Sequence, residues 1–202
     1  MHNRLFRRLG AFTMLALLAG AAQAHSGNGS HGLMQGLAHP LAADHLLAML
    51  AVGLWSASAL PPGQVWRGPA AFLLAMGASA LAGMAGATLP LLEHAVALTT
   101  VLFGAMLVLA ARPLAMPPAI GLVLIAAAAA LHGLAHGAEA PAAGASGYAM
   151  GFLVTTAALH LAGVGVGVSI QRWLGARAGL GLRGLGLGLG AAGLSLFVQL
   201  AA

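Results

Sequence analysis

Long apolar segments separated by short breaks constrain this 202-residue chain more than any other feature of its sequence. Each segment is about 20 residues long, the length that an α-helix needs to cross the hydrocarbon core of a bilayer. Six are expected, over residues 33–60, 69–89, 91–112, 114–136, 148–171 and 178–202. Only 5% of the residues are charged, whereas a soluble protein carries roughly 25%. The sequence therefore predicts an all-α integral membrane protein, a six-helix transmembrane bundle whose outer surface contacts lipid.

The first 24 residues have the pattern of an export signal. Three arginines in the first eight residues precede an apolar stretch, and Ala22-Gln23-Ala24 fits a signal-peptidase site. We expect residues 1–24 to be a cleavable signal peptide, with an uncleaved first transmembrane helix as the alternative. In both cases His25 lies outside the cytoplasm. Residues 25–32 then form a periplasmic tail that contains histidines.

The arginines that follow the signal segment indicate the orientation of the bundle. With residue 25 outside, six crossings place all of them on the cytoplasmic side, as the positive-inside rule requires. They are Arg67, Arg112, Arg172, Arg177 and Arg183. We therefore expect a bacterial inner membrane protein with both mature termini in the periplasm. Because these arginines are spread over short loops, the net charge of +5 does not indicate a nucleic-acid partner.

Several classes of function are excluded by the composition of the chain. There is no cysteine, so imidazole, carboxylate and thioether groups are the metal ligands available. There is no lysine, which a Walker A loop for ATP requires. Gly179–Gly184 matches G-x-G-x-x-G, but no strand precedes this apolar segment, so we do not expect a dinucleotide site. Glycines at 184, 186, 188 and 190 instead predict close packing of helices.

Each acidic residue lies near a histidine, on the side of the bundle expected to face the periplasm. In the first group, we expect Pro40 to start a helix with His39 at its mouth, and Asp44 and His45 at least one turn inside. A paired carboxylate and imidazole can bind a cation or form a hydrogen bond between helices. Met49, one turn beyond His45, adds a weak thioether ligand or packs in the core.

The second group is His132, His136 and Glu139. Spacings of four and three residues place them on one face of a helix that we expect to end before Pro141. Two imidazoles and a carboxylate in this arrangement can form a metal site with open positions. The glycine after each histidine leaves room for another helix or for water. The alternative is a solvated loop at the end of the helix.

Further histidines give weaker candidates. Glu93 and His94 form a surface cap or support a metal ligand. His160, deep in the fifth segment, is a ligand on a metal pathway or makes a hydrogen bond between helices. His25 and His31 capture metal through imidazole and the free α-amine, or belong to a flexible linker.

In these motifs the chain resembles the HupE/UreJ family. The resemblance rests on His39-Pro40 with Asp44–Met49, on His132-Gly133 with Ala135–Gly137 and Glu139, and on His160. The family is linked to hydrogenase and urease maturation and is regarded as nickel permeases. The resemblance implies metal-binding roles for His39, Asp44, His45, His132, His136, Glu139 and His160.

The resemblance also implies what this protein would transport. Nickel(II), with cobalt(II) as a second candidate, would pass from periplasm to cytoplasm as a transported ion, without a permanently bound cofactor. Maturation proteins of nickel enzymes would be its partners. The same residue types also suit an intramembrane zinc-dependent hydrolase, in which the metal activates water. A haem-binding subunit would need His45 and His160 as axial ligands.

Overall fold

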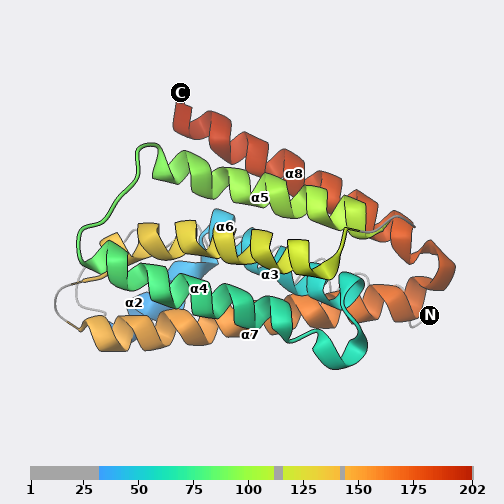
Figure 1. The fold of residues 1–202 in the computed structure, drawn as a ribbon, viewed down its shortest axis with the longest axis horizontal. Helices are drawn as coiled ribbons and strands as arrows, with labels where there is room; N and C mark the ends of the chain where they lie inside the picture. Colours follow the sequence, from blue (N-terminus) through green and yellow to red (C-terminus); the bar gives the residue numbers. More distant parts are fainter. Residues whose placement is uncertain (1–31, 112–115, 142–143, 202) are drawn as a thin grey trace, which may run out of the picture.

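The computed structural model describes residues 32–111, 116–141 and 144–201. Its regular structure is helical throughout these residues, which confirms the predicted all-α class (Figure 1). The α-helices are α2 (Leu33–Ala38), α3 (Ala43–Ala59), α4 (Arg67–Met84), α5 (Leu92–Ala110), α6 (Pro118–Ala138), α7 (Ala145–Leu174) and α8 (Ala178–Ala201). Short 3-10 helices are η1 (His39–Leu41), η2 (Pro62–Gln64) and η3 (Gly175–Arg177). The expected signal peptide, with His25 and His31, lies outside the described residues.

Four helical stretches in the described residues are long and apolar enough to cross a membrane. They are Pro62–Met84, Leu92–Ala110, Pro118–Ala138 and Ala145–Ala201. A fifth is added if the bent pair Leu33–Leu41 and Ala43–Ala59 counts as one span. The last stretch, of 57 residues, contains both α7 and α8. Figure 1 shows the chain reversing at η3, so that α8 runs back beside α5.

The first predicted segment is broken at Ala42, two residues after Pro40. The helices on either side of the break meet at a bend of 74°. Pro40 has no N–H for a helical hydrogen bond, and Ala42 after it is extended, with ψ of 146°. Helix α3 therefore begins after the proline and not at it. This corrects the expectation that Asp44 and His45 lie at least one turn inside a helix, because both lie in the first turn of α3.

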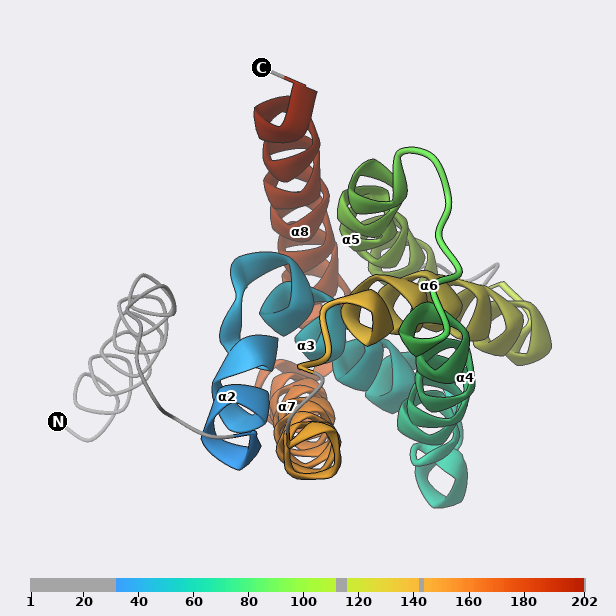
Figure 2. The same ribbon diagram turned by 90° about the vertical axis from the view of Figure 1, so that its left-hand side faces the viewer.

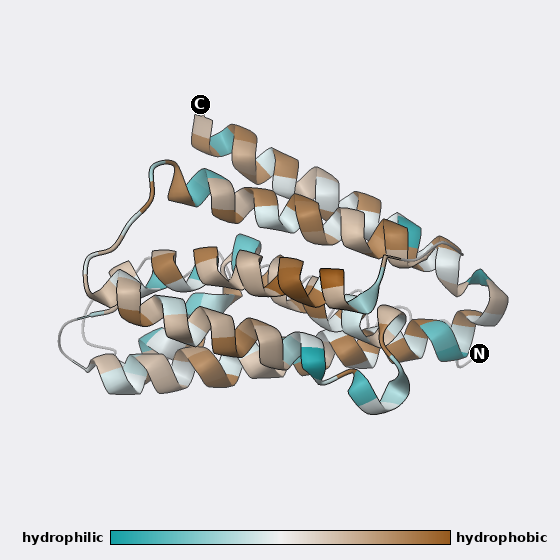
Figure 3. Ribbon diagram, viewed as in Figure 1, coloured by the Kyte–Doolittle hydropathy of each residue, from teal (hydrophilic) through white to brown (hydrophobic). Residues whose placement is uncertain are grey.

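Three arginines and two carboxylates lie toward opposite ends of the bundle (Figure 1), on helices whose residues are mostly hydrophobic or neutral (Figure 3). Arg67 begins α4, Arg172 lies in the last turn of α7 and Arg177 lies in η3, and these parts of the chain lie toward the same end. Glu93 in the first turn of α5 and Glu139 at the end of α6 lie at the other end. Among the described residues, these arginines and these carboxylates therefore lie at different ends of the bundle.

Glycines permit the closest helix contacts. The glycines after His132 and His136 pack against the backbone of α4, where an added Cβ would collide with main-chain oxygen atoms. The space beside these glycines was expected to hold another helix or water, and in the structure it holds helix α4. On α8, Gly186 packs against Gly104 of α5, and a Cβ on Gly104 would also collide with Gly190. The spacing of four between Gly186 and Gly190 therefore provides the predicted helix contact. Figure 2 shows α4 beside α6 and α5 beside α8 in end view.

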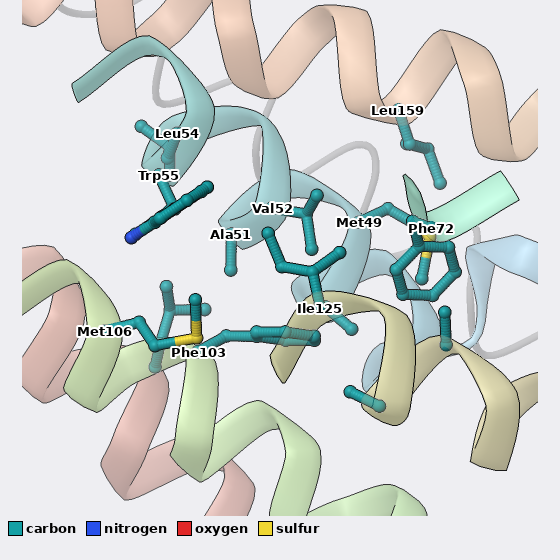
Figure 4. Close-up of a cluster of buried hydrophobic side chains, with 14 of the residues drawn as sticks. Met49, Ala51, Val52, Leu54, Trp55, Phe72, Phe103, Met106, Ile125 and Leu159 are labelled. Carbon is teal, nitrogen blue, oxygen red and sulfur yellow. The ribbon is translucent and has the colours of Figure 1, made fainter. Parts of the chain in front are cut away.

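An apolar core fills the space between the helices (Figure 4). Trp55, Phe72, Phe103 and Ile125 are among its largest buried side chains. Met49 is fully buried in the same cluster. Met49 was predicted to be either a weak thioether ligand or a core residue, and in the structure it packs in the core.

Candidate metal centre

Short elements and helix ends bring five of the predicted site residues together. His39 comes from η1 and His45 from the first turn of α3. His132 and His136 lie in the last two turns of α6, and Glu139 is its C-cap residue. Within the described part of the chain, ligand atoms less than 4.8 Å apart define two groups of three residues. We call His45, His132 and His136 the inner group, and His39, His136 and Glu139 the outer group.

The inner group consists of imidazoles removed from water. His45 and His132 are both 0% exposed. The ring centroid of His45 lies 4.1 Å from that of His136 and 4.7 Å from that of His132. The Nδ1 atoms of His45 and His132 are 3.3 Å apart. Three imidazoles in such proximity suit nickel, cobalt, copper or zinc, all of which accept nitrogen ligands.

The outer group adds a carboxylate and is accessible to water. Oε2 of Glu139 lies 3.1 Å from Nδ1 of His136 and 3.3 Å from Nε2 of His39. The two imidazole nitrogens are 2.8 Å apart. The side chain of Glu139 is 50% exposed and that of His39 is 27% exposed. A cation arriving from solution therefore meets this group before it meets the inner one.

Hydrogen bonds keep the carboxylate of the outer group ionised. The bond from His136, followed by that from His39, holds the pKa of Glu139 well below its usual range, although partial burial opposes this effect. Glu139 lies just beyond the end of α6. The outer group therefore presents a negative charge to an incoming cation near neutral pH.

Two imidazole nitrogens of the inner group lack hydrogen-bond partners among the described residues. They are Nε2 of His45 and Nε2 of His136, both buried. An unpaired polar atom in a buried position costs free energy, and a bound cation would recover it. The donor set thus fits a divalent transition metal.

Asp44 is not part of either group. It is partly exposed in the first turn of α3, directly before His45. Its carboxylate is close in sequence to the centre, but its ligand atoms are not within the distance that defines the two groups.

Glu93 and His94 lie at the same end of the bundle but outside the two groups. Together with Glu139 they line an open cavity of about 520 Å³. The ring of His94 packs edge-on against Phe197 of α8, with a centroid distance of 5.3 Å. This cavity places Glu93 at an approach to the outer group.

His160 lies deeper and is separated from the inner group by an aromatic ring. Its centroid is 5.0 Å from that of Phe72, and Phe72 is 5.7 Å from His132. Nδ1 of His160 donates a hydrogen bond to the carbonyl oxygen of Thr156, within α7. Its Nε2 is buried and finds no partner in the described part of the chain. The hydrogen bond that is seen is therefore within one helix and not between helices.

Two further residues contact the histidines of the centre but are not part of the histidine motifs seen in the sequence. Phe152 of α7 packs against His39, His45 and His136, with centroid distances between 5.2 and 5.6 Å. Thr99 of α5 contacts Nε2 of His132 at 2.8 Å. A polar residue inside an otherwise apolar segment was the available signal for Thr99, whereas Phe152 resembles any other core aromatic.

Comparison with known proteins identifies the family. The HupE / UreJ protein family matches residues 13–196. Protein HupE of Rhizobium leguminosarum bv. viciae is similar, with 40% identity over 158 residues that cover 76% of this chain and 81% of that protein. No solved structure matches the chain. The family match covers both ligand groups and all the helices except the end of α8, so this membrane protein belongs to the HupE/UreJ family of hydrogenase and urease accessory proteins.

Proposed function

We propose that this protein is a permease that moves nickel(II) from the periplasm to the cytoplasm, for the maturation of urease or hydrogenase. The observation that carries the proposal is the pair of ligand groups that share His136, one exposed and one buried. Adjacent sites of moderate affinity suit transport, because an ion must be able to leave as well as to bind. Cobalt(II) is the second candidate ion, since it accepts the same nitrogen and oxygen ligands.

The proposal requires six crossings of the bacterial inner membrane. Helices α2 and α3 with η1 form one broken crossing, and α4, α5, α6, α7 and α8 form one each. The reversal of the chain at η3 supports counting α7 and α8 separately. The end of the bundle with Arg67, Arg172 and Arg177 faces the cytoplasm, since positive residues favour that side. The mature N-terminus, the C-terminus and the outer group then face the periplasm.

The metal would follow a path through successive ligand groups. His25 and His31 of the exported tail gather it, and the outer group holds it at the mouth. His136 then passes it to the inner group, whose His45 directly follows Asp44 in the first turn of α3. His160, whose Nε2 is buried and unpaired among the described residues, receives it beyond Phe72. Glu93 and His94 would support the approach to Glu139.

An intramembrane zinc-dependent hydrolase is the second candidate function. A cavity of about 240 Å³, lined mostly by apolar side chains, adjoins His136 between α4, α6 and α7. Three histidines and a water molecule are the ligand set of several catalytic zinc sites. This function predicts a tightly retained metal at fixed stoichiometry, whereas a permease predicts weak and exchangeable binding.

The proposed function is tested by uptake of radioactive nickel at sub-micromolar concentration. Cells that lack other nickel permeases would express the wild-type chain, His45→Ala or an empty vector, at membrane levels matched by immunoblotting. We expect uptake by the wild type, a rate at least about 30-fold lower for His45→Ala, and stronger competition by cobalt than by zinc. Wild-type uptake equal to that of empty-vector cells would refute the permease, and retained zinc with hydrolysis of a peptide substrate would then favour the second function.

A further inference from the structure

A buried hydroxyl on α5 adjoins the inner group without belonging to it. Thr99 is 4% exposed. Its Oγ1 lies 2.7 Å from the carbonyl oxygen of Val96 and 2.8 Å from Nε2 of His132. A hydroxyl has a single hydrogen, and a carbonyl oxygen can only accept one. The hydroxyl of Thr99 therefore donates to Val96 and can only accept from His132.

This direction determines which nitrogen of His132 carries a proton. Nε2 must be the N–H group, because it donates to Oγ1 of Thr99. A neutral imidazole has one N–H, so Nδ1 of His132 has the free lone pair. Nδ1 is also the atom that lies 3.3 Å from His45 within the inner group.

The tautomer of His132 also determines which nitrogen of His45 carries a proton. Because Nδ1 of His132 is an acceptor, Nδ1 of His45 donates to it in the metal-free protein. The lone pair of His45 is then on Nε2, the atom that is buried without a partner among the residues described. A chain of hydrogen bonds that ends at one backbone carbonyl thus sets the lone pairs of two proposed ligands.

We infer that Thr99 is a positioning residue: it holds His132 in the tautomer with hydrogen on Nε2 and so presents the Nδ1 lone pair to the transported cation. This inference rests on the proposed function of the inner group. An imidazole that binds a metal through one nitrogen is commonly oriented by an acceptor at the other. Here the acceptor is a threonine hydroxyl, from a helix that supplies neither group with a ligand.

The chain offers a set of matched variants for the test. Thr99→Val keeps the shape of the side chain and removes the hydroxyl, while Thr99→Ser keeps the hydroxyl. Thr100→Val is the control, because Thr100 is also buried and its Oγ1 has no partner in the described residues. His160 gives an internal reference, since its proton is set by a backbone carbonyl and not by Thr99.

The first readout is the tautomer itself, measured without metal. Nitrogen-15 NMR of histidine-labelled full-length protein in lipid bilayers distinguishes N–H from unprotonated nitrogen, and His132→Gln identifies the signals of His132. We expect hydrogen on Nε2 of His132 in the wild type, Thr99→Ser and Thr100→Val, and a mixture of tautomers in Thr99→Val. The signals of His160 should not change.

The second readout is binding of nickel(II) to the same purified proteins. Loss of an orienting partner typically weakens a metal site by about 10- to 100-fold, so we expect that loss in Thr99→Val and recovery in Thr99→Ser. Hydrogen on Nδ1 of His132 in the wild type would overturn the inference, even if Thr99→Val failed to fold. Equal losses of nickel affinity in Thr99→Val and Thr99→Ser would also overturn it. If cells with the wild-type protein took up no nickel, the permease would be refuted. The tautomer of His132, measured without metal, would still test the role of Thr99.

Discussion

The inner and outer groups share His136, yet they differ in ligand chemistry and in exposure to water. The outer group combines two imidazoles with a carboxylate that is 50% exposed. The inner group has three imidazoles, of which two are fully buried. An exposed carboxylate attracts a cation from solution by its charge. Buried imidazoles offer stronger nitrogen ligation, but only to an ion that has lost part of its water shell.

Under the proposed function, this difference indicates that the ion moves from the outer group to the inner one. The outer group can bind a partly hydrated ion, and the inner group requires further loss of water. His136 belongs to both, so the ion can exchange ligands one at a time without being fully released. We therefore propose that the outer group captures the ion and that the inner group passes it on, two roles that mutation can separate.

Removing the shared residue should have the largest effect. His136→Ala takes one ligand from each group, so we expect nickel uptake to fall by about 100-fold or more, to the level of empty-vector cells. Uptake of radioactive nickel at matched membrane levels measures this, and a thermal melt of the purified variant shows that it is folded. Uptake above a third of the wild-type rate would break the assignment of His136 to both groups.

Removing a residue of the inner group alone should separate passage from capture. We expect His45→Ala to lower uptake by about 30-fold or more, while the outer group still binds one nickel ion weakly. Equilibrium dialysis of the purified variant measures the binding. Met49→Leu, a buried change one turn along α3, is the control and should transport normally. Near-normal uptake by His45→Ala would mean that the ion bypasses the inner group.

Neutralising the outer group should alter capture more than passage. Glu139→Gln keeps the size of the side chain but removes the charge that His136 and His39 stabilise. We expect the half-saturating nickel concentration to rise about tenfold, equivalent to about 1.4 kcal/mol, with little change in the maximal rate. Initial rates over a range of nickel concentrations separate the two quantities. A lower maximal rate at unchanged half-saturation would contradict the capture role.

The smallest effect is expected for the histidine at the same end that belongs to neither group. His94 packs against Phe197 and lines the cavity shared with Glu139. We expect His94→Ala to transport nickel within about twofold of the wild type, because His94 supplies no ligand to either group and is not among the buried residues. The same uptake assay applies. If His94→Ala lost as much nickel uptake as His136→Ala, any histidine at this end of the bundle would be required, whether or not it belongs to a ligand group.

Much of this architecture could be predicted from the sequence, because length and hydropathy are properties of local segments. Helical spacing predicted that His132, His136 and Glu139 lie on one face of a helix. In the structure, Nδ1 of His136 lies 3.1 Å from Oε2 of Glu139. A helix boundary near Pro40 was predictable, but the angle of the bend at Ala42 was not. That angle depends on how α2 packs against α7, which is a tertiary contact.

The partition of the site into two groups was not predictable. It arises because η1 brings His39 to Glu139 while α3 brings His45 to His132, and no spacing in the sequence encodes the distance between those elements. The contact of Thr99 with His132 likewise joins residues 33 positions apart. Asp44 and His45 are neighbours in sequence, yet only His45 belongs to a group, because the first turn of α3 directs adjacent side chains to different faces.

Transport by purified protein in liposomes tests the central claim most directly. Full-length wild type and His45→Ala would be reconstituted at equal density around an enclosed dye that nickel(II) quenches, with nickel added outside. We expect rapid, saturable quenching with the wild type and a rate close to that of empty liposomes with His45→Ala. Wild-type liposomes no faster than empty ones, or equal rates for the two proteins, would contradict passage of nickel through the inner group.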